Sequence, residues 1–221
     1  MRPDVFGALV SFDEALRHSL AAAQPIARRE KTALVYALDR VASADVIATL
    51  DVPPFDRSAM DGYAVRAGDL QADGPTTLRC VDRIFTGEVS DRVLGAGECI
   101  EISTGAPMPQ GADAVVMVER TTRNGDAVTF AGGVTAGQHI GRRGADLRTG
   151  QAIVRAGDLL TPARIGALAA AGVMGVEIYE RPSVAILSTG NEVTSPGKAL
   201  PLGDVYDVNR FTLRAGAEFH G

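Results

Sequence analysis

Apolar residues near the N-terminus repeat with the period of a helix. They recur at every fourth position from Phe12 to Leu20, so their side chains share one helix face. Ser11 and Glu14 form the S-x-x-E pattern of a capping box at the start, and Pro25 interrupts the pattern. The sequence therefore predicts a helix from about residue 12 to residue 24.

Two shorter patterns follow this helix. The segment "TALVYALDRVA", residues 32–42, predicts a second helical piece. The segment "DVIATLDV", residues 45–52, predicts a strand. This strand should end at Pro53 and Pro54, since proline has no N–H to donate to a neighbouring strand.

The pattern changes between residues 64 and 139, where short β-like segments alternate with glycine-rich turns. "TTLRCV", residues 76–81, and "DAVVMVE", residues 113–119, are two of these segments, and "GAGE" and "RNGD" are two of the turns. Closely spaced strands separated by turn signals predict a small β-barrel or sandwich.

A further helix is predicted within "TPARIGALAAAG". Thr161 is placed as its N-cap, Pro162 as its first helical residue and Gly172 as the residue that ends it.

The C-terminal part has the pattern of an α/β sheet. "PSVAILSTGNEV", residues 182–193, is nearly all apolar until its Ser-Thr-Gly turn, which predicts a buried parallel strand. A helix should follow, with Asp207 or Asn209 as its N-cap. A parallel sheet needs several strand–helix crossovers and this part offers about one, so we expect this last domain to be incomplete.

Composition and charge narrow the class of protein. With 221 residues, 46% of them hydrophobic, the chain can bury a sizeable core as a soluble globular protein. It has no apolar run of membrane-spanning length and no secretory signal, so we expect a cytoplasmic protein without a membrane partner. The net charge of −5 argues against nucleic acid as a partner, because phosphate binding needs a basic face.

The two cysteines, Cys80 and Cys99, are far apart in the sequence and lack C-x-x-C spacing. This arrangement predicts two buried, reduced thiols rather than a zinc site or a disulfide framework.

The turn Ser188-Thr189-Gly190-Asn191-Glu192 follows the predicted C-terminal strand, where α/β sheets bind their ligands. Gly190 allows close approach of a ligand to the backbone, and the two hydroxyls can bond an anionic oxygen. Glu192 adds a carboxylate suited to a divalent cation. The same pattern also fits a plain strand-to-loop turn.

A second turn, Ser103-Thr104-Gly105, again places two hydroxyls before a glycine, and two prolines stiffen the residues that follow. Taken alone, it fits the ordinary turn chemistry of a β-barrel loop better than a binding site.

The loop "GRRGADLRTG" sets Arg142, Arg143 and Asp146 between glycines. Arginines in such a loop can clamp a phosphate or another oxyanion through bidentate bonds. A solvated, charge-balanced loop is the alternative.

The stretch "DVPPFDRSAMDGYAV", residues 51–65, begins with a rigid proline pair that fixes an extended backbone. It leads into an Asp-Gly turn that displays oxygen atoms of Ser58 and Asp61. Met60 has the residue type of core filler, and its role there is not explained by the pattern.

Taken together and in this order, the four stretches resemble the MoeA proteins of molybdenum-cofactor synthesis and their eukaryotic counterpart, the gephyrin E domain. "PPFDRSAMDGYAV" is the longest and most specific of them, and the similarity runs from about Ser11 to the C-terminus. The chain departs from the family at Asn191, where many relatives have Asp. It also departs in length, since the family's chain is nearly twice as long.

This resemblance implies a molybdopterin molybdenumtransferase, which inserts molybdenum from molybdate into adenylylated molybdopterin with Mg²⁺ as cofactor and releases AMP. It implies an elongated homodimer with the site in a cleft between the subunits. The difference in length implies that this chain is a fragment without the rest of the pterin-binding domain. Two alternatives are a non-catalytic gephyrin-like scaffold and a pterin-adenylylating domain, and the β-rich stretch argues against the latter.

The resemblance also assigns roles to residues. It makes Asp61, Thr104, Asp146 and Glu192 catalytic, and Asp61 and Glu192 also metal ligands. The substrate-binding residues that it implies are Ser58, Met60, Ser103, Gly105, Arg142, Arg143, Ser188, Thr189, Gly190 and Asn191.

The expected fold is a multidomain combination of α+β and α/β parts. Residues 1–26 form an N-terminal helix packed on the α/β domain, and residues 27–50 with 138–177 form an elongated mixed α/β linker domain. Residues 51–137 form an inserted small β-barrel-like domain. Residues 178–221 begin a truncated, parallel-sheet molybdopterin-binding domain.

Overall fold

The computed structural model describes residues 10–220, and these residues divide into two compact units. The first unit combines the residues up to 45 with 154–165 and those from 174 onward. The second unit combines 46–153 with 166–173. The boundaries predicted from the sequence for four domains stay a prediction.

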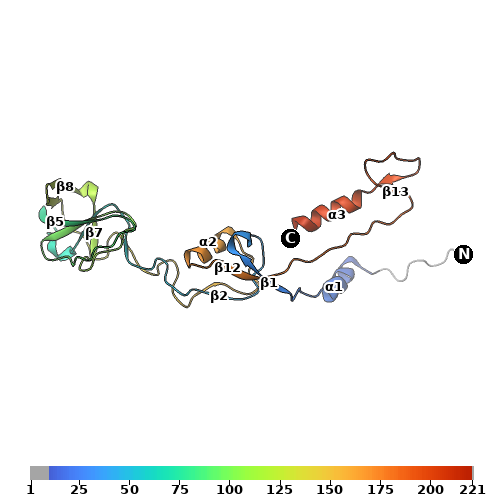
Figure 1. Ribbon diagram of the computed structural model, residues 1–221, viewed down its shortest axis with the longest axis horizontal. Coiled ribbons are helices and arrows are strands. Elements are labelled where there is room, and N and C mark those ends of the chain that lie inside the picture. The colour runs from blue at the N-terminus through green and yellow to red at the C-terminus, as the bar shows by residue number, and fades with distance from the viewer. Residues whose placement is uncertain (1–9, 221) are drawn as a thin grey trace. The chain divides into compact units, whose positions relative to one another are not determined.

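The second unit is built on one six-stranded curled sheet, shown in Figure 1 around the labels β5, β7 and β8. Its strands lie in the order β7-β4-β6-β5-β9-β8. Only β5 and β6 pair in parallel; the other neighbours are antiparallel. The strands are β4 (Gly62–Val65), β5 (Thr76–Ile84), β6 (Glu98–Ile102), β7 (Ala114–Met117), β8 (Thr121–Asn124) and β9 (Ala127–Phe130). The predicted run of short strands is confirmed as a single sheet.

Strand β4 is buried on both faces. Along β4, Tyr63 and Val65 belong to one apolar cluster while Ala64 belongs to another, because alternate side chains of a strand point to opposite faces. The first cluster contains the edge-to-face ring pair of Tyr63 and Phe130, whose centroids lie 5.9 Å apart. The second is centred on Ile84, Ile100 and Ile102.

Gly62, the first residue of β4, is required by a close backbone approach. A Cβ atom at this position would overlap the carbonyl oxygen of Val116 on the neighbouring strand β7. The glycine of the Asp-Gly pair is therefore part of the sheet, and the bend expected there lies before it, at residues 59–61.

Two chain segments run side by side from this sheet (Figure 1). Their pairing is sparse, with an isolated bridge between Val52 and Leu147 and a small cluster of Ala48, Leu147 and Ala171. The strand predicted over 45–52 is confirmed only as two residues. The paired strands are β2 (Val46–Ile47) with β11 (Ala152–Val154), and β3 (Arg57–Ser58) with β10 (Ile140–Gly141).

Two carboxylates on either side of the proline pair hold these segments together. Asp51 accepts hydrogen bonds from Arg143 Nε at 2.6 Å and from the backbone N–H of Thr149 at 2.8 Å. Asp56 accepts from Arg142 Nη1 and from the backbone N–H of Arg143, both at 2.7 Å. The backbone N–H of Thr149 is the main cause that lowers the pKa of Asp51, and that of Arg143 lowers the pKa of Asp56.

The first unit contains an antiparallel pair, β1 (Arg29–Ala33) with β12 (Gly175–Tyr179). The helix predicted over 32–42 is wrong: this segment completes β1 and continues as the short 3₁₀ turn Leu34–Tyr36. Backbone bonds to β12, and from the N–H of Leu34 to the carbonyl of Met174, outweigh the weak helix propensity of these residues.

Three helices begin at side-chain caps that the sequence predicted. Ser11 caps α1 (Phe12–Ala22), and Asp207 caps α3 (Val208–Phe219). Thr161 Oγ1 accepts from the N–H of Arg164 at 3.4 Å, at the start of α2 (Pro162–Ala170). Helix α2 ends before Gly172, whose φ of +77° favours glycine. Helix α1 buries none of its residues, so its predicted packing on the α/β domain stays a prediction.

The continuous buried strand predicted over 182–193 is wrong. Residues 181–190 form no strand, and Val184 and Leu187 are 63% and 88% exposed. An extended segment becomes a strand only when a neighbouring strand accepts its backbone hydrogen bonds, and no described residue does so here. The parallel pairing is limited to β13 (Val193–Thr194) with β14 (Val205–Tyr206).

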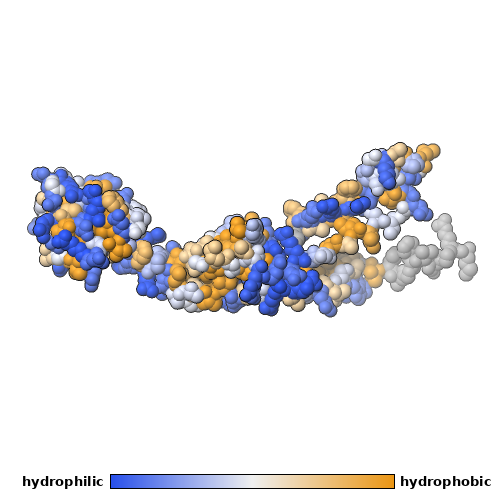
Figure 2. All heavy atoms as spheres, in the orientation of Figure 1, coloured by the Kyte–Doolittle hydropathy of each residue, from blue (hydrophilic) through white to orange (hydrophobic). Residues whose placement is uncertain are grey.

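In the region of α3, Figure 2 shows hydrophobic residues next to hydrophilic ones. The apolar side chains exposed in this helix include Phe211, Leu213 and Phe219. Within the described part of the chain, no helix has both the length and the apolar character needed to cross a bilayer.

A glycine substitution tests the close approach of β4 to β7. We expect Gly62→Ala to lower the free energy of unfolding by about 2 kcal/mol or more, because the added methyl group forces the two backbones apart. Gly68→Ala is the matched control, since a Cβ there meets no atom within 4 Å. Urea unfolding measures both variants, and equal effects would contradict the role of Gly62.

The hydrogen bonds that the Asp51 carboxylate accepts from Arg143 and Thr149 predict that stability depends on pH. Since the pKa of Asp51 is lowered in the fold, its contribution is present above the unfolded value of about 3.9 and is lost as the pH falls through the folded value. We expect Asp51→Asn to unfold at lower urea concentration than the wild type at pH 7. This difference should shrink below about pH 4. Asp73→Asn, at an exposed acid, is the control. A difference between Asp51→Asn and the wild type that does not change with pH would contradict this role of Asp51.

Candidate functional site

Asp61 joins two of the stretches singled out in the sequence. Its Oδ1 accepts a hydrogen bond of 2.7 Å from the backbone N–H of Thr104, although the two residues lie 43 positions apart. Its own carbonyl accepts from the N–H of Val118 at 3.1 Å. The Asp61 carboxylate thus caps the Ser103-Thr104-Gly105 turn, and both Asp61 and Thr104 stay exposed.

Ser58 is a structural centre of this arrangement. It is 1% exposed, and its hydroxyl donates to the carbonyl of Met60 at 2.5 Å. Its carbonyl accepts from the N–H of Gly105 at 2.8 Å, and its N–H donates to the carbonyl of Ala106 at 2.9 Å. These bonds fix the two turns against each other, which leaves Ser58 little surface for a ligand.

The side chain of Met60 is 39% exposed, so this residue is not core filler. Only its backbone is held, by the Ser58 hydroxyl. The structure thereby leaves a flexible apolar side chain partly exposed at the residue before Asp61.

The arginine loop lies next to the same turn. The carbonyl of His139 accepts from the N–H of Ala59 at 2.9 Å, so the loop and the Asp61 turn are neighbours along the β3–β10 pair. Arg142 and Arg143 are ion-paired with Asp56 and Asp51, and their side chains remain 60% and 64% exposed. Their free donors can therefore still reach an anion in solution.

Asp146, also in this loop, presents an exposed carboxylate. Its backbone N–H donates to the carbonyl of Val52 at 2.9 Å, which fixes the position of its Cα atom. Three of the four predicted stretches are thus gathered in the second unit.

Sequence reasoning missed the roles of Asp51 and Asp56. The signal was present, because two acids flank the proline pair and two adjacent arginines lie in the later loop. Two acids in one segment and two arginines in another are candidates for ion pairing. Thr86 was missed as well: its hydroxyl donates to the carbonyl of Thr104 at 2.6 Å, and no pattern in the sequence marks it.

The fourth stretch, residues 188–192, belongs to the first unit and lies at the start of α3. The Ser188 hydroxyl donates to Asp207 Oδ1 at 2.9 Å, and the same oxygen accepts from the N–H of Arg210 at 3.0 Å. A pocket of about 390 Å³ opens here, lined among others by Thr189, Glu192 and Asn209. Hydroxyl and amide groups at a helix start suit anionic oxygens.

Gly190 has a φ of +142°, a conformation that side chains with a Cβ rarely adopt. A Cβ at this position would also lie 2.8 Å from Glu192 Oε1. The glycine is therefore needed for the carboxylate of Glu192 to fold back over the turn. Asn191 and Glu192 are both exposed.

The predicted metal ligands, Asp61 and Glu192, belong to different units. Among residues 10–220, no three His, Cys, Asp or Glu side chains gather closely enough to hold a metal ion by themselves. Mg²⁺ is commonly held by one or two carboxylates together with waters and substrate phosphates. Asp61 or Glu192 alone could therefore supply one carboxylate ligand to such a Mg²⁺ ion.

Comparison with known proteins identifies the family. Residues 10–172 match the family described as "MoeA N-terminal region (domain I and II)". The molybdopterin molybdenumtransferase of Haemophilus influenzae is 40% identical over 179 residues, which are 80% of this chain and 44% of that protein. The enzyme of the same name from Staphylococcus aureus is 36% identical over 189 residues, 84% of this chain and 45% of that protein.

Solved structures agree with this match. A crystal structure of the molybdopterin biosynthesis MoeA protein from Pyrococcus horikoshii has a TM-score of 0.88 and 34% identity. The match covers 96% of this chain and 57% of that one. The chain spans about half the length of the curated relatives it matches. On these grounds the chain belongs to the MoeA family and carries its N-terminal region.

Proposed function

We propose that this chain provides part of a molybdopterin molybdenumtransferase, which inserts molybdenum from molybdate into adenylylated molybdopterin and releases AMP. The observation that carries the proposal is the hydrogen bond from the Thr104 N–H to the Asp61 carboxylate. This bond joins two stretches of the second unit that carry candidate catalytic residues. The relatives of this chain are named for the same activity.

Asp61 is proposed as a metal ligand and as the residue that positions the Thr104 turn. One of its carboxylate oxygens accepts the Thr104 N–H, which leaves the other oxygen for a cation. Mg²⁺, when bound, would neutralise the negative charge that develops on the oxygens of the transferred group. The exposed Thr104 hydroxyl is a donor for an oxyanion. The N–H groups of its turn already donate within the fold and hold that hydroxyl in place.

Arg142, Arg143 and Asp146 are proposed to hold the charged substrate. Because Asp56 and Asp51 already bind the two guanidinium groups, the arginines are held in place before an anion arrives. Fixed donors stabilise developing charge without reorganising during the reaction. Met60, partly exposed at the residue before Asp61, is proposed to provide an apolar contact.

The turn at residues 188–192 is proposed as the second group of substrate contacts. Thr189 and the N–H groups at the start of α3 that Asp207 does not bind suit phosphate or pterin oxygens. The Ser188 oxygen, whose proton is donated to Asp207, can accept from a donor of the substrate. Glu192 is proposed as the metal ligand of this turn, with the Asn191 side-chain oxygen beside it. The homodimer implied by the resemblance and the cytoplasmic location expected from the sequence are part of the same proposal, and light scattering would measure the dimer.

A chimaeric protein, in which these residues keep their numbers, tests the catalytic roles. It joins this chain to the remaining C-terminal part of the Haemophilus influenzae relative, and molybdate-dependent AMP release is measured. We expect Asp61→Asn and Glu192→Gln each to lower turnover about 100-fold or more with unchanged unfolding midpoints. The Asp61→Asn change keeps a side-chain oxygen that can accept the Thr104 N–H, so the turn is retained while the charge is lost.

Asp73→Asn is the control for these variants, because it removes an exposed carboxylate of the second unit that lies outside the four stretches. Turnover equal to wild type in both site variants would contradict the site assignment. A folded wild-type chimaera that releases no AMP would contradict the proposed function itself.

Metal removal tests the role of Glu192 separately. We expect chelation to stop turnover of the chimaera and added Mg²⁺ to restore it. Glu192→Gln should raise the Mg²⁺ concentration for half-maximal turnover by about tenfold or more, the usual effect of weakening a metal site. An unchanged Mg²⁺ requirement would remove Glu192 from the set of metal ligands.

A further inference from the structure

Cys80 and Cys99 lie opposite each other in the six-stranded sheet. They are paired residues of the parallel strands β5 and β6, although they are far apart in the sequence. Both contact the same apolar cluster around Tyr63 and Phe130, so their side chains share one face of the sheet. Neighbouring strands lie about 4.8 Å apart, within the Cα separation of roughly 4.4–6.8 Å that a disulfide requires.

The strand pairing is irregular at this position. The register of β5 and β6 shifts between Cys80 and Asp82, and the N–H of Cys80 donates to the carbonyl of Asp126, on the far side from β6. The Cys80 thiol donates to the carbonyl of Asp82 at 3.5 Å. A bulge bends the strand and disrupts the ladder locally, which gives the two Cβ atoms room to adjust.

The two thiols differ in access. Cys80 is half-buried, whereas Cys99 is fully buried. Burial, together with the neighbouring Cys80, raises the pKa of the Cys99 thiol to about 12. A reagent from solution therefore meets Cys80 first, and Cys99 can react only with a partner already inside the sheet.

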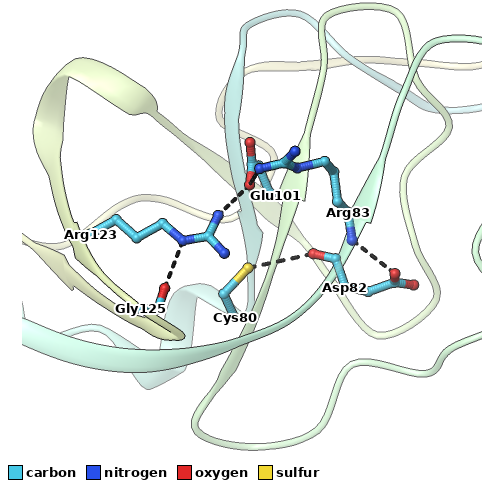
Figure 3. A network of polar contacts seen from close by, with 6 residues as sticks. All are labelled: Cys80, Asp82, Arg83, Glu101, Arg123 and Gly125. Carbon is cyan, nitrogen blue, oxygen red and sulfur yellow. Dashed lines mark hydrogen bonds and ion pairs between the residues drawn. The ribbon is translucent and has the colours of Figure 1, made fainter.

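A fixed cation lies beside the accessible thiol, as Figure 3 shows for Cys80 and Arg123. Arg123 Nε donates to the carbonyl of Gly125 at 2.8 Å, and its Nη1 pairs with Glu101, which also binds Arg83 at 2.7 Å. An arginine beside a partly exposed thiol is one of the features that favour cysteine reactivity.

We propose that Cys80 and Cys99 form a thiol-modification site that closes to a cross-strand disulfide by exchange with a small disulfide such as glutathione disulfide. The Cys80 sulfur, having lost its proton, attacks one sulfur of the reagent; the S–S bond breaks, and the departing thiolate takes up a proton. The Cys99 sulfur then loses its proton and attacks the Cys80 sulfur, which releases the second thiol. Two protein thiols are oxidised and one reagent disulfide is reduced to two thiols.

Mass spectrometry of the folded chain tests this site. After incubation with glutathione disulfide for hours, the wild type should lose two hydrogens, carry no adduct and resist alkylation at both cysteines. Cys99→Ala should stop at a single glutathione adduct on Cys80. Cys80→Ser should stay unmodified, because the remaining thiol is buried. Circular dichroism confirms that each variant is folded.

Three results would overturn the proposal. The wild type could keep both thiols open to alkylation after unfolding, or it could accumulate a stable adduct without closing. The Cys80→Ser variant could react as fast as the wild type, which would place the first attack at Cys99. None of these readouts depends on molybdenum transfer, so the result is independent of the proposed function.

Discussion

The burial of strand β4 on both faces is the constraint on which the second unit depends. Between β6 and β7, Gly62 permits a backbone approach that any side chain would prevent, and the next three residues fill two apolar clusters. Asp61 comes immediately before this strand. The position of Asp61 is therefore fixed by a strand that is buried on both faces, and its carboxylate holds the Thr104 turn. Sites on rigid elements keep their geometry better than sites on loops.

Local signals in the sequence predicted what depends on local chemistry. Ser11, Thr161 and Asp207 act as helix caps because a capping bond spans only two or three residues. The segments over 32–42 and 182–193 were misjudged since their state depends on a partner strand. One such strand, β12, is present and pairs with the start of the first segment. No described strand pairs with the other segment along its length.

The site was predictable as a set of motifs, but its geometry was not. The sequence places Asp61, Thr104 and the arginine loop in separate stretches, and only the sheet register brings them together. Ser58 shows that residue type alone does not identify a ligand-binding residue. Its hydroxyl lies in a motif predicted to bind substrate, yet the residue is almost fully buried and holds two turns together. The acids that hold the arginines were visible in the sequence, yet their pairing depends on two segments that lie nearly a hundred positions apart.

The side-by-side course of the two segments that enter and leave the six-stranded sheet has a topological consequence. Because β3 pairs with β10, the chain leaves this sheet next to the point where it enters. The strands between β3 and β10 thus form an inserted segment whose two ends are already held together. Lengthening or exchanging this inserted cassette therefore adds little loop-closure entropy to the rest of the chain. Such an arrangement lets the cassette diverge in sequence and size while its base stays anchored by the same pair of carboxylates.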